Sequence, residues 1–339
     1  MSYSAPPANP PIQSSKRARL IQRLKCDRRL KLNSRMSKSR SAKSSLVLLL
    51  SGIMLSLAGC NNSSLSEAAA KFTDHDDDQH CVRVSQPFKH SLCSVSQEQL
   101  SKPQPSVHLK LFWRPADVSS KSASEPKSQT NPAVKSNSQP APSEQKPLYT
   151  FKALLSDLPD TSKLAFAANA GMYNKDFAPI GYTVIEGQEI LSLNLKEGAG
   201  NFHLLPNGVL WWNKSGEVFI TESHEMQQML DKGKAEPWYA TQSGPMLVIK
   251  GAIHPQFDPN STSLKFRNGV GVCTDGKVKF VNSDQPVSFY QFAALFKDDL
   301  SCPNALFLDG GIASALYAPD ISQEDDKNMG VMVGVVKDQ

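Results

Sequence analysis

The sequence lacks any apolar run long enough to cross a membrane as a helix. Its longest run, Leu46–Ala58, is interrupted by two serines and a glycine and is shorter than the roughly 20 residues that a spanning helix needs. Lysine and arginine precede this run, and small residues end it before Cys60. A basic head, a short apolar core and a small-residue cleavage site are typical of a secretory signal. A short membrane helix or a buried core helix is the alternative interpretation.

Residues 1–59 contain almost no acidic side chains. They hold 12 of the 37 lysine and arginine residues and a single acid, Asp27. Removing them leaves 25 basic and 31 acidic residues, so a precursor of net charge +5 becomes a protein of net charge −6. No basic excess remains that would indicate nucleic-acid binding. The basic head is long for a signal, and a start at Met36 would give a conventional leader of 24 residues. Residues 1–35 are then either an upstream start assigned in error or a basic extension.

The residues Leu57-Ala58-Gly59-Cys60 resemble the bacterial lipobox. In proteins with this motif the cysteine thiol receives a diacylglycerol, and cleavage makes the cysteine the new N-terminus. The resemblance implies that acylated Cys60 anchors the protein in a lipid bilayer, because three acyl chains exceed the two signals that stable anchoring requires. Asn61 and not Asp follows the cysteine, which by similarity to Gram-negative sorting favours the outer membrane. The expected location is the bacterial cell envelope, on its periplasmic or surface face.

Cysteine is sparse beyond the lipobox. The cysteines that remain are Cys81, Cys93, Cys273 and Cys302. An exported, oxidising compartment favours two disulfides among them. Three connectivities are possible, and proximity in the sequence favours Cys81–Cys93 and Cys273–Cys302. Reduced, buried thiols are the alternative, and none of the four stands in a convincing context for a catalytic nucleophile.

The composition divides the exported part into a tether and one domain. Residues 60–80 are polar and rich in Ser, Ala and Asp, which predicts a flexible tether after the lipidated cysteine. Residues 81–339 form the predicted domain. Within it, Ser, Pro, Lys and Gln crowd residues 118–147, a composition that cannot bury enough apolar surface to become ordered. This segment is either an interdomain linker or a disordered insertion.

The sequence also lacks the regular alternation of strands and helices that a doubly wound parallel sheet would show. Turn signals at Glu186-Gly187 and Asp275-Gly276 predict β-hairpins. A capping box and apolar residues at helical spacing predict a helix over Ser288–Asp298, and Glu222–Lys232 is a second expected helix. Strands and hairpins are expected over Val107–Trp113, Leu164–Ala168, Gly181–Leu193, Val209–Trp212, Val218–Thr221, Met246–Ile249, Val270–Asn282, Ala305–Leu308 and Met329–Val336. The predicted class is α+β, with a mixed, mostly antiparallel β-sheet core of many short strands and a few flanking helices.

Four segments place glycine beside polar groups just after predicted strands. They are Asn169–Tyr173, Thr241–Met246, Arg267–Gly271 and Leu308–Ser314. Glycine lets a ligand approach the backbone and frees amide N–H groups for anionic oxygens. Each segment alone is compatible with a polar turn, whereas four of them in one domain predict that strand ends converge on one pocket.

The region from Phe166 to Tyr317 resembles the phosphodiester glycosidase family. The resemblance is carried by residues spread over seven segments. They are Asn169–Tyr173, Pro179–Gly181, Gly200–Phe202, Pro206–Val209, Ala240–Met246, Arg267–Val272 and Ala305–Gly311. The best-known member, the lysosomal uncovering enzyme, removes N-acetylglucosamine from a sugar-1-phosphate diester. The resemblance implies an exported hydrolase that cleaves a sugar-1-phosphate phosphodiester in envelope or extracellular glycans. It also implies that the strand at Val107–Trp113 shares a sheet with the strand before Asn169, which favours an insertion at 118–147.

The resemblance also suggests which residues would carry the reaction. A departing phosphate is a weak base, so it needs a cation and hydrogen-bond donors more than a proton. Arg267 suits the phosphate oxygens, Asp309 would activate water or stabilise an oxocarbenium-like sugar, and Asn169 would bind a sugar hydroxyl or orient the water. The remaining candidates for substrate binding are Ser243, Gly244, Gly310, Gly311, Ser314 and His203.

Each assignment has a structural alternative. Asp309 would serve equally as a turn cap or a ligand of a structural cation, Arg267 as an ion-pair partner, and His203 as a packed core residue. No metal-ligand set with recognisable spacing is present, although a divalent cation at the carboxylate-bearing glycine turn would be compatible with the sequence. The segment Phe307–Ser314 lacks the third glycine and one serine of the uncovering-enzyme motif. This departure motivates the alternative of a non-catalytic glycan-binding or envelope-assembly lipoprotein.

Overall fold

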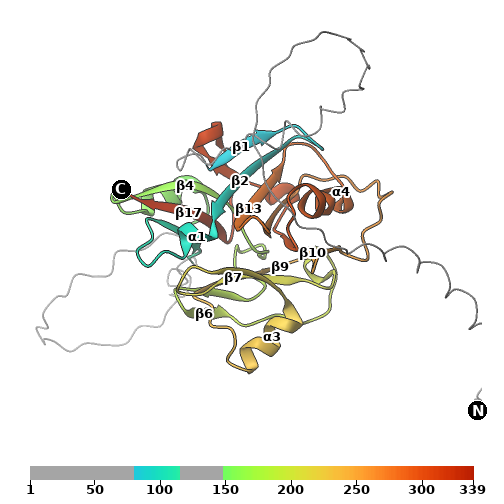
Figure 1. Cartoon of the computed structure of the whole chain (residues 1–339), viewed down its shortest axis with the longest axis horizontal. Helices are drawn as coiled ribbons and strands as arrows, with labels where there is room; N and C mark the ends of the chain where they lie inside the picture. Colours follow the sequence, from blue (N-terminus) through green and yellow to red (C-terminus); the bar gives the residue numbers. More distant parts are fainter. Residues whose placement is uncertain (1–79, 115–147) are drawn as a thin grey trace, which may run out of the picture. The chain divides into compact units, whose positions relative to one another are not determined.

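The structure is a computed structural model that describes residues 80–114 and 148–339. These residues form three antiparallel sheets with four short α-helices, so the predicted α+β class is confirmed (Figure 1). The predicted leader with Cys60, the tether up to residue 79 and the insertion at 118–147 lie outside the described residues. In the part of the chain that is described, no helix is long and apolar enough to span a membrane.

The first sheet has seven strands in the order β1-β2-β13-β12-β14-β10-β11. Their bounds are Cys81–Val84, His90–Ser96, Lys277–Ser283, Asn268–Val272, Asn304–Phe307, Met246–Ile249 and Ala252–Ile253. The predicted hairpin at Asp275-Gly276 joins β12 to β13. The strands β1 and β2 were not predicted, and β2 pairs with β13, almost two hundred residues further along the chain.

The second sheet has the order β16-β15-β4-β17-β3. Its strands are Gln323–Glu324, Leu316–Ala318, Ser162–Asn169, Met332–Asp338 and Val107–Phe112. The strand β3 therefore shares a sheet with β4, as expected, and β17 lies between the two.

The third sheet has the order β6-β5-β9-β7-β8. Its strands are Gln188–Leu191, Thr183–Ile185, Tyr239–Ser243, Gly208–Trp212 and Val218–Glu222. The predicted hairpin turns at Glu186-Gly187, where both residues have positive φ angles of 51° and 78°. The helix α3, Ser223–Asp231, lies on one face of this sheet (Figure 1). Its Met226 belongs to the same buried cluster as Val209 and Trp211.

The main core lies between the sheets, and the other helices cover its margins. Phe166, Phe280 and Leu210, one from each sheet, belong to one buried cluster. The remaining α-helices are α1 at Gln97–Leu100, α2 at Phe151–Asp157 and α4 at Phe289–Ala294. Three 3-10 helices are described, η2 at Asn201–His203, η4 at Gly311–Ala313 and η5 at Pro319–Ile321. Burial of these apolar faces supplies the main stabilisation of the fold.

The predicted helix at 288–298 begins as expected and then changes its winding. Ser288 and Gln291 form the predicted capping box. After α4 the chain continues as a π-helix, Leu295–Asp299, in which Leu300 N donates to Leu295 O at 2.9 Å. The periodicity of apolar residues identifies a helix but does not distinguish α from π winding, because the inward-facing positions are nearly the same over one turn.

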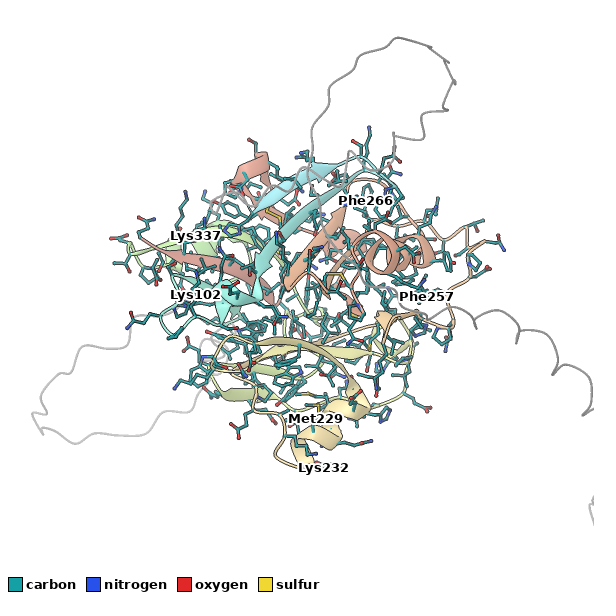
Figure 2. The ribbon with its side chains drawn as sticks, viewed as in Figure 1. Lys102, Met229, Lys232, Phe257, Phe266 and Lys337 are labelled. Carbon is teal, nitrogen blue, oxygen red and sulfur yellow. A yellow bond between two sulfur atoms is a disulfide. The ribbon has the colours of Figure 1, made fainter. Side chains whose placement is uncertain are left out.

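Both predicted disulfides are present. Cys81–Cys93 joins β1 to β2, and Cys273–Cys302 joins the end of the β12 strand to the segment after α4 (Figure 2). Their sequence separations are 12 and 29 residues. Each restricts the unfolded chain, and the longer loop gives the larger expected effect.

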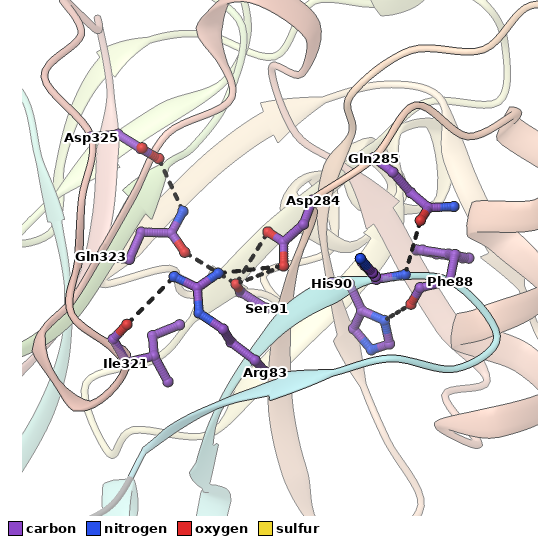
Figure 3. A network of polar contacts seen from close by, with 10 residues as sticks. Arg83, Phe88, His90, Ser91, Asp284, Gln285, Ile321, Gln323 and Asp325 are labelled. Atoms are coloured by element: carbon purple, nitrogen blue, oxygen red, sulfur yellow. Dashed lines mark hydrogen bonds and ion pairs between the residues drawn. The ribbon is translucent and has the colours of Figure 1, made fainter.

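A polar network fastens the first sheet to the segment that follows the η4 turn (Figure 3). Ser91 Oγ donates to Gln323 Oε1 at 3.1 Å and lies within 3.4 Å of both carboxylate oxygens of Asp284. Arg83 lies 3.6 Å from Asp284 and donates to Ile321 O at 3.4 Å. Residues 321–323 are therefore held against β1 and β2, which fixes the far end of the segment that begins at Asp309.

Candidate active site

The side chain of Asn169 joins the ends of three strands. Asn169 is the last residue of β4 and is fully buried. Its Nδ2 donates to the carbonyl oxygen of Asp309. Its Oδ1 accepts from Asn268 Nδ2 at 2.7 Å and from Ala315 N at 2.9 Å. Because both ends of the amide are engaged, Asn169 positions the turn that carries Asp309. The direct contact with a sugar hydroxyl or water stays a prediction.

Asp309 follows β14 and presents a partly exposed carboxyl group. Its backbone N–H donates to Ala170 O at 3.1 Å, which ties the glycine turn to the end of β4. Burial raises the pKa of the Asp309 carboxyl from 3.8 to about 6, because the protein withholds water from the charged form. A carboxyl group with this pKa exchanges protons near neutral pH, which is the property of a catalytic base or acid.

Tyr173 stands near Asp309 and was not among the predicted site residues. Burial, and then the negative charge of Asp309, raise the pKa of the Tyr173 phenol to about 12. Its hydroxyl donates to Asn328 O at 3.3 Å. Tyr173 ends the motif that begins at Asn169, so the motif itself was the signal that pointed to it.

Arg267 lies immediately before β12, and its guanidinium group is enclosed. The side chain is 3% exposed, and its Cζ lies 3.5 Å from the ring centroid of Phe289. Nε donates to Val287 O at 2.9 Å and Nη2 to Ser263 O at 3.3 Å. No ion pair between described residues includes Arg267.

The charge of Arg267 is therefore balanced by carbonyl oxygens and an aromatic face. Burial lowers the pKa of Arg267 to about 10, so it remains a cation at neutral pH. Two of its five donors are engaged by the contacts above. Its side chain presents little surface to a ligand from outside, and the phosphate contact stays a prediction.

The glycine turn brings the backbone of Arg267 close to that of Asp309. A Cβ on Gly310 would lie 2.6 Å from the Phe307 ring and 3.3 Å from Arg267 Cα, so a side chain is excluded there. Gly311 has a φ of 74°, which favours glycine, and its N–H donates to Phe266 O at 2.9 Å. The Gly311 N–H is thus already used within the protein, which leaves it unavailable as the phosphate donor we expected unless this bond breaks.

Ser314 lies at the other end of the turn, beside a lysine that sequence reasoning missed. Ser314 is 8% exposed, and its Oγ accepts from Asn282 Nδ2 at 3.3 Å. Its carbonyl oxygen accepts from Lys327 Nζ at 2.6 Å. Since Asn169 contacts both Asp309 and the residue after Ser314, Lys327 contributes a partly exposed cation to the same turn. It stands in a polar stretch with no motif that would have revealed it.

Ser243 and Gly244 lie behind this group. Ser243 ends β9 and is fully buried, and its Oγ has no hydrogen-bond partner among the described residues. A Cβ on Gly244 would lie 2.6 Å from the Cβ of Asn207. The next residue, Pro245, follows a cis peptide bond and accepts from Phe307 N at 3.1 Å. Ser243 and Gly244 therefore lead directly into a contact with β14, the strand that ends just before Asp309. Whether Ser243 and Gly244 contact substrate stays a prediction.

His203 stands apart from the Asp309 group. Its Nδ1 lies 2.7 Å from Lys196 O, and its ring packs edge-on to Phe202 at a centroid distance of 5.0 Å. None of its hydrogen bonds within the described residues reaches Asp309 or Asn169. The structural alternative, a histidine packed on its neighbours, accounts for these contacts, and a role in binding stays a prediction.

The described residues offer no obvious metal site. Nowhere in residues 80–114 and 148–339 do three His, Cys, Asp or Glu side chains gather in a group that could hold a metal ion.

Comparison with known proteins places this geometry in a family. The phosphodiester glycosidase family matches residues 162–336, about half of the chain, which include every predicted catalytic residue. The uncharacterized protein YigE of Escherichia coli strain K12 is 38% identical over 166 residues, which cover 48% of this chain and 62% of that relative.

Solved structures were also found to be similar. A hypothetical protein from Synechocystis has a TM-score of 0.47 and 13% identity, over 76% of this chain and 61% of the other. The catalytic domain of zebrafish N-acetylglucosamine-1-phosphodiester alpha-N-acetylglucosaminidase, auto-inhibited by its pro-peptide, has a TM-score of 0.43 and 14% identity, over 77% of this chain and 98% of the other. The match of residues 162–336 decides the assignment: the chain belongs to the phosphodiester glycosidase family.

Proposed function

We propose that the Asp309 group hydrolyses a phosphodiester that joins the anomeric carbon of a sugar to phosphate. Water adds to the anomeric carbon, the bond from that carbon to the phosphate oxygen breaks, and the products are a free sugar and a phosphomonoester. The observation that carries the proposal is the Asp309 carboxyl, partly exposed at a glycine turn with a pKa of about 6. Family membership supports the same reaction class.

Asp309 acts in its ionised form. The carboxylate accepts the proton of the attacking water, and its negative charge stabilises the positive character that develops on the sugar ring. Only the ionised fraction is active in this role. We therefore expect kcat/KM for a sugar-1-phosphate diester to rise with pH through about 6 and then level off. A rate that falls over the same interval would show that Asp309 acts as a general acid.

The leaving phosphate gains negative charge as the bond breaks, so cations near the turn lower the barrier. Lys327 is the more accessible of the two candidates, and its Nζ is held only by a carbonyl oxygen among the contacts described above. Arg267 contributes from its enclosed position behind Gly310. We assign the phosphate contact to Lys327 and a long-range electrostatic contribution to Arg267.

The test is release of reducing sugar and phosphomonoester from a panel of sugar-1-phosphate diesters by the purified protein. Asp309→Asn should lower kcat by about 10²–10⁴-fold, the range expected for a catalytic acid or base. Lys327→Gln should lower kcat, because its cation acts on charge that develops only as the bond breaks. Asp160→Asn and Lys265→Gln, which change exposed side chains of the same types, serve as controls. Full activity of Asp309→Asn would sink the assignment. Binding without release of sugar would instead support the non-catalytic glycan-binding function suggested by the altered turn motif.

We further propose that the protein is exported and held in the cell envelope through acylated Cys60, with the outer membrane favoured by Asn61. Two disulfides support this, since such bonds persist in oxidising compartments. Metabolic labelling with palmitate tests the anchor: label should appear in the wild-type protein and be absent from Cys60→Ala. Label retained by the variant would exclude this site of lipidation.

A further inference from the structure

A hollow of about 470 Å³ lies where the second and third sheets meet, away from the Asp309 group. Its walls come from the end of α1 and the loop after it, from residues 108–110 of β3, from the β7–β8 turn at residues 213–216, and from the start of β9. Lys102, on the rim, lies at this junction in Figure 2. The volume falls within the roughly 300–1,000 Å³ range of small-ligand sites.

Aromatic side chains form one wall of the hollow. Trp238 N donates to Trp212 O and Trp238 O accepts from Gly187 N, both at 2.8 Å, so the backbone beneath the indole is fixed. A Cβ on Gly187 would lie 2.8 Å from the indole ring, and glycine therefore allows the ring to occupy this position. Trp212 stacks on Tyr239 behind it at a centroid distance of 5.1 Å.

The opposite wall is basic. His108 and Lys110, which flank the buried Leu109 in β3, both line the hollow. Lys214 places its Nζ 4.8 Å from the ring centroid of Trp238. Lys102 completes the basic set, and no ion pair between described residues includes any of these three lysines.

Among the described residues, the carboxylates near the hollow do not pair with its lysines. Glu186 is the one carboxylate that lines the hollow, and it accepts a hydrogen bond from the Tyr239 hydroxyl at 3.2 Å. His108 pairs with Asp338 at 3.1 Å, outside the lining. Three lysines therefore face a cavity that holds a single, already hydrogen-bonded carboxylate.

We propose that this hollow binds an anionic saccharide, one carrying a phosphate or carboxylate group. The indole of Trp238 would meet the apolar C–H face of the sugar ring, and the ammonium groups of Lys110 and Lys214 would meet the anionic group. The site is separate from the Asp309 group, because it lies at the Tyr239 end of β9 while Ser243 ends the strand about 13 Å away, at roughly 3.3 Å per residue. Binding here does not depend on the proposed hydrolysis.

The experiment is isothermal titration calorimetry of the full chain carrying Asp309→Asn, so that turnover cannot interfere. The ligands are glucose 6-phosphate, glucose and inorganic phosphate. Glucose 6-phosphate should bind more tightly than either of the other two. Replacing Lys110 and Lys214 together by Gln should weaken its binding about tenfold or more, as the loss of charge-assisted hydrogen bonds predicts.

A matched pair of exposed lysines serves as the control. Lys232→Gln with Lys234→Gln removes the same charge at and beyond the end of α3, where Lys232 lies well away from the hollow (Figure 2). This pair should leave the affinity unchanged. Trp238→Ala should abolish binding, while Trp238→Phe should retain part of it.

The proposal is overturned if glucose 6-phosphate shows no measurable binding. It is also overturned if replacing Lys110 and Lys214 leaves the affinity for glucose 6-phosphate unchanged, or weakens it no more than the control replacements of Lys232 and Lys234 do. Inorganic phosphate binding as tightly as glucose 6-phosphate would refute the saccharide contact, and glucose binding as tightly would refute the ionic one.

Discussion

Replacing Asp309 by Asn should stabilise the protein while it inactivates the enzyme. Burial raises the carboxyl pKa from 3.8 to about 6, so the folded state holds its proton more tightly than the unfolded chain. The stability that depends on this group is fully present below pH 3.8 and is lost as the pH rises through 6. The interval between the two pKa values corresponds to about 3 kcal/mol, and partial exposure of the side chain reduces this to about 2–3 kcal/mol.

The asparagine side chain carries no charge at any of these pH values, so the variant does not lose this stability as the pH rises. Thermal unfolding of the wild type and of Asp309→Asn should be followed at pH 4 and at pH 8. The free energy of unfolding of the variant, relative to that of the wild type, should be higher at pH 8 than at pH 4 by about 2–3 kcal/mol. This corresponds to roughly 5–10 °C in the difference between their melting temperatures. Asp160→Asn, at an exposed aspartate, is the control for a general change in charge.

The reasoning fails if the melting temperatures of the two proteins change in parallel between pH 4 and pH 8. That result would mean that Asp309 is as well solvated in the folded protein as in the unfolded chain. Its proposed role as a base near neutral pH would then lose its physical basis, whatever the kinetic assay gave.

Three further predictions address the surroundings of the site. Arg267→Lys should lower the free energy of unfolding by about 1–3 kcal/mol in urea titrations. Lysine cannot keep both the stacking on Phe289 and the buried hydrogen bond that Nε donates to Val287 O. A variant as stable as the wild type would contradict the enclosed geometry. Gly171→Ala should lower both stability and kcat, since its Cβ would lie 2.5 Å from the carbonyl oxygen of Gln242, and an unchanged crystal structure with full activity would refute this. Replacing Cys273 and Cys302 by Ala should cost about 3–4 kcal/mol by calorimetry, from the 29-residue separation; a loss below about 1 kcal/mol would argue against the chain-entropy explanation.

Local signals in the sequence predicted much of the fold. The turns at Glu186-Gly187 and Asp275-Gly276 and the cap at Ser288 depend on neighbouring residues, so they can be recognised without knowledge of the partner strands. The strands β1 and β2 could not be recognised in this way. Their pairing with β13 is non-local, and it is the sheet that selects their conformation.

The candidate site was predicted in part for the same reason. Asn169 and Asp309 belong to glycine-containing motifs whose order along the chain is distinctive, and the structure joins them by a hydrogen bond. Lys327 reaches the site because the loop before β17 folds back over the glycine turn, and the Tyr173 hydroxyl donates to Asn328 O of the same loop. Nothing in the residues around Lys327 signals that approach. The burial of Arg267 between Phe289 and a backbone carbonyl likewise depends on packing that no motif encodes.

The position of β17 inside the second sheet also limits when that sheet can form during folding. This strand lies between β3 and β4, and Met332 pairs with Asn169. During synthesis, β3 and β4 emerge first, with open edges facing an empty position, and they wait for about 160 residues before their common neighbour is made. Sheets that depend on such distant pairing form slowly. For a chain that is threaded through a membrane before folding, as an exported protein would be, this sheet cannot be completed until β17 has also crossed the membrane.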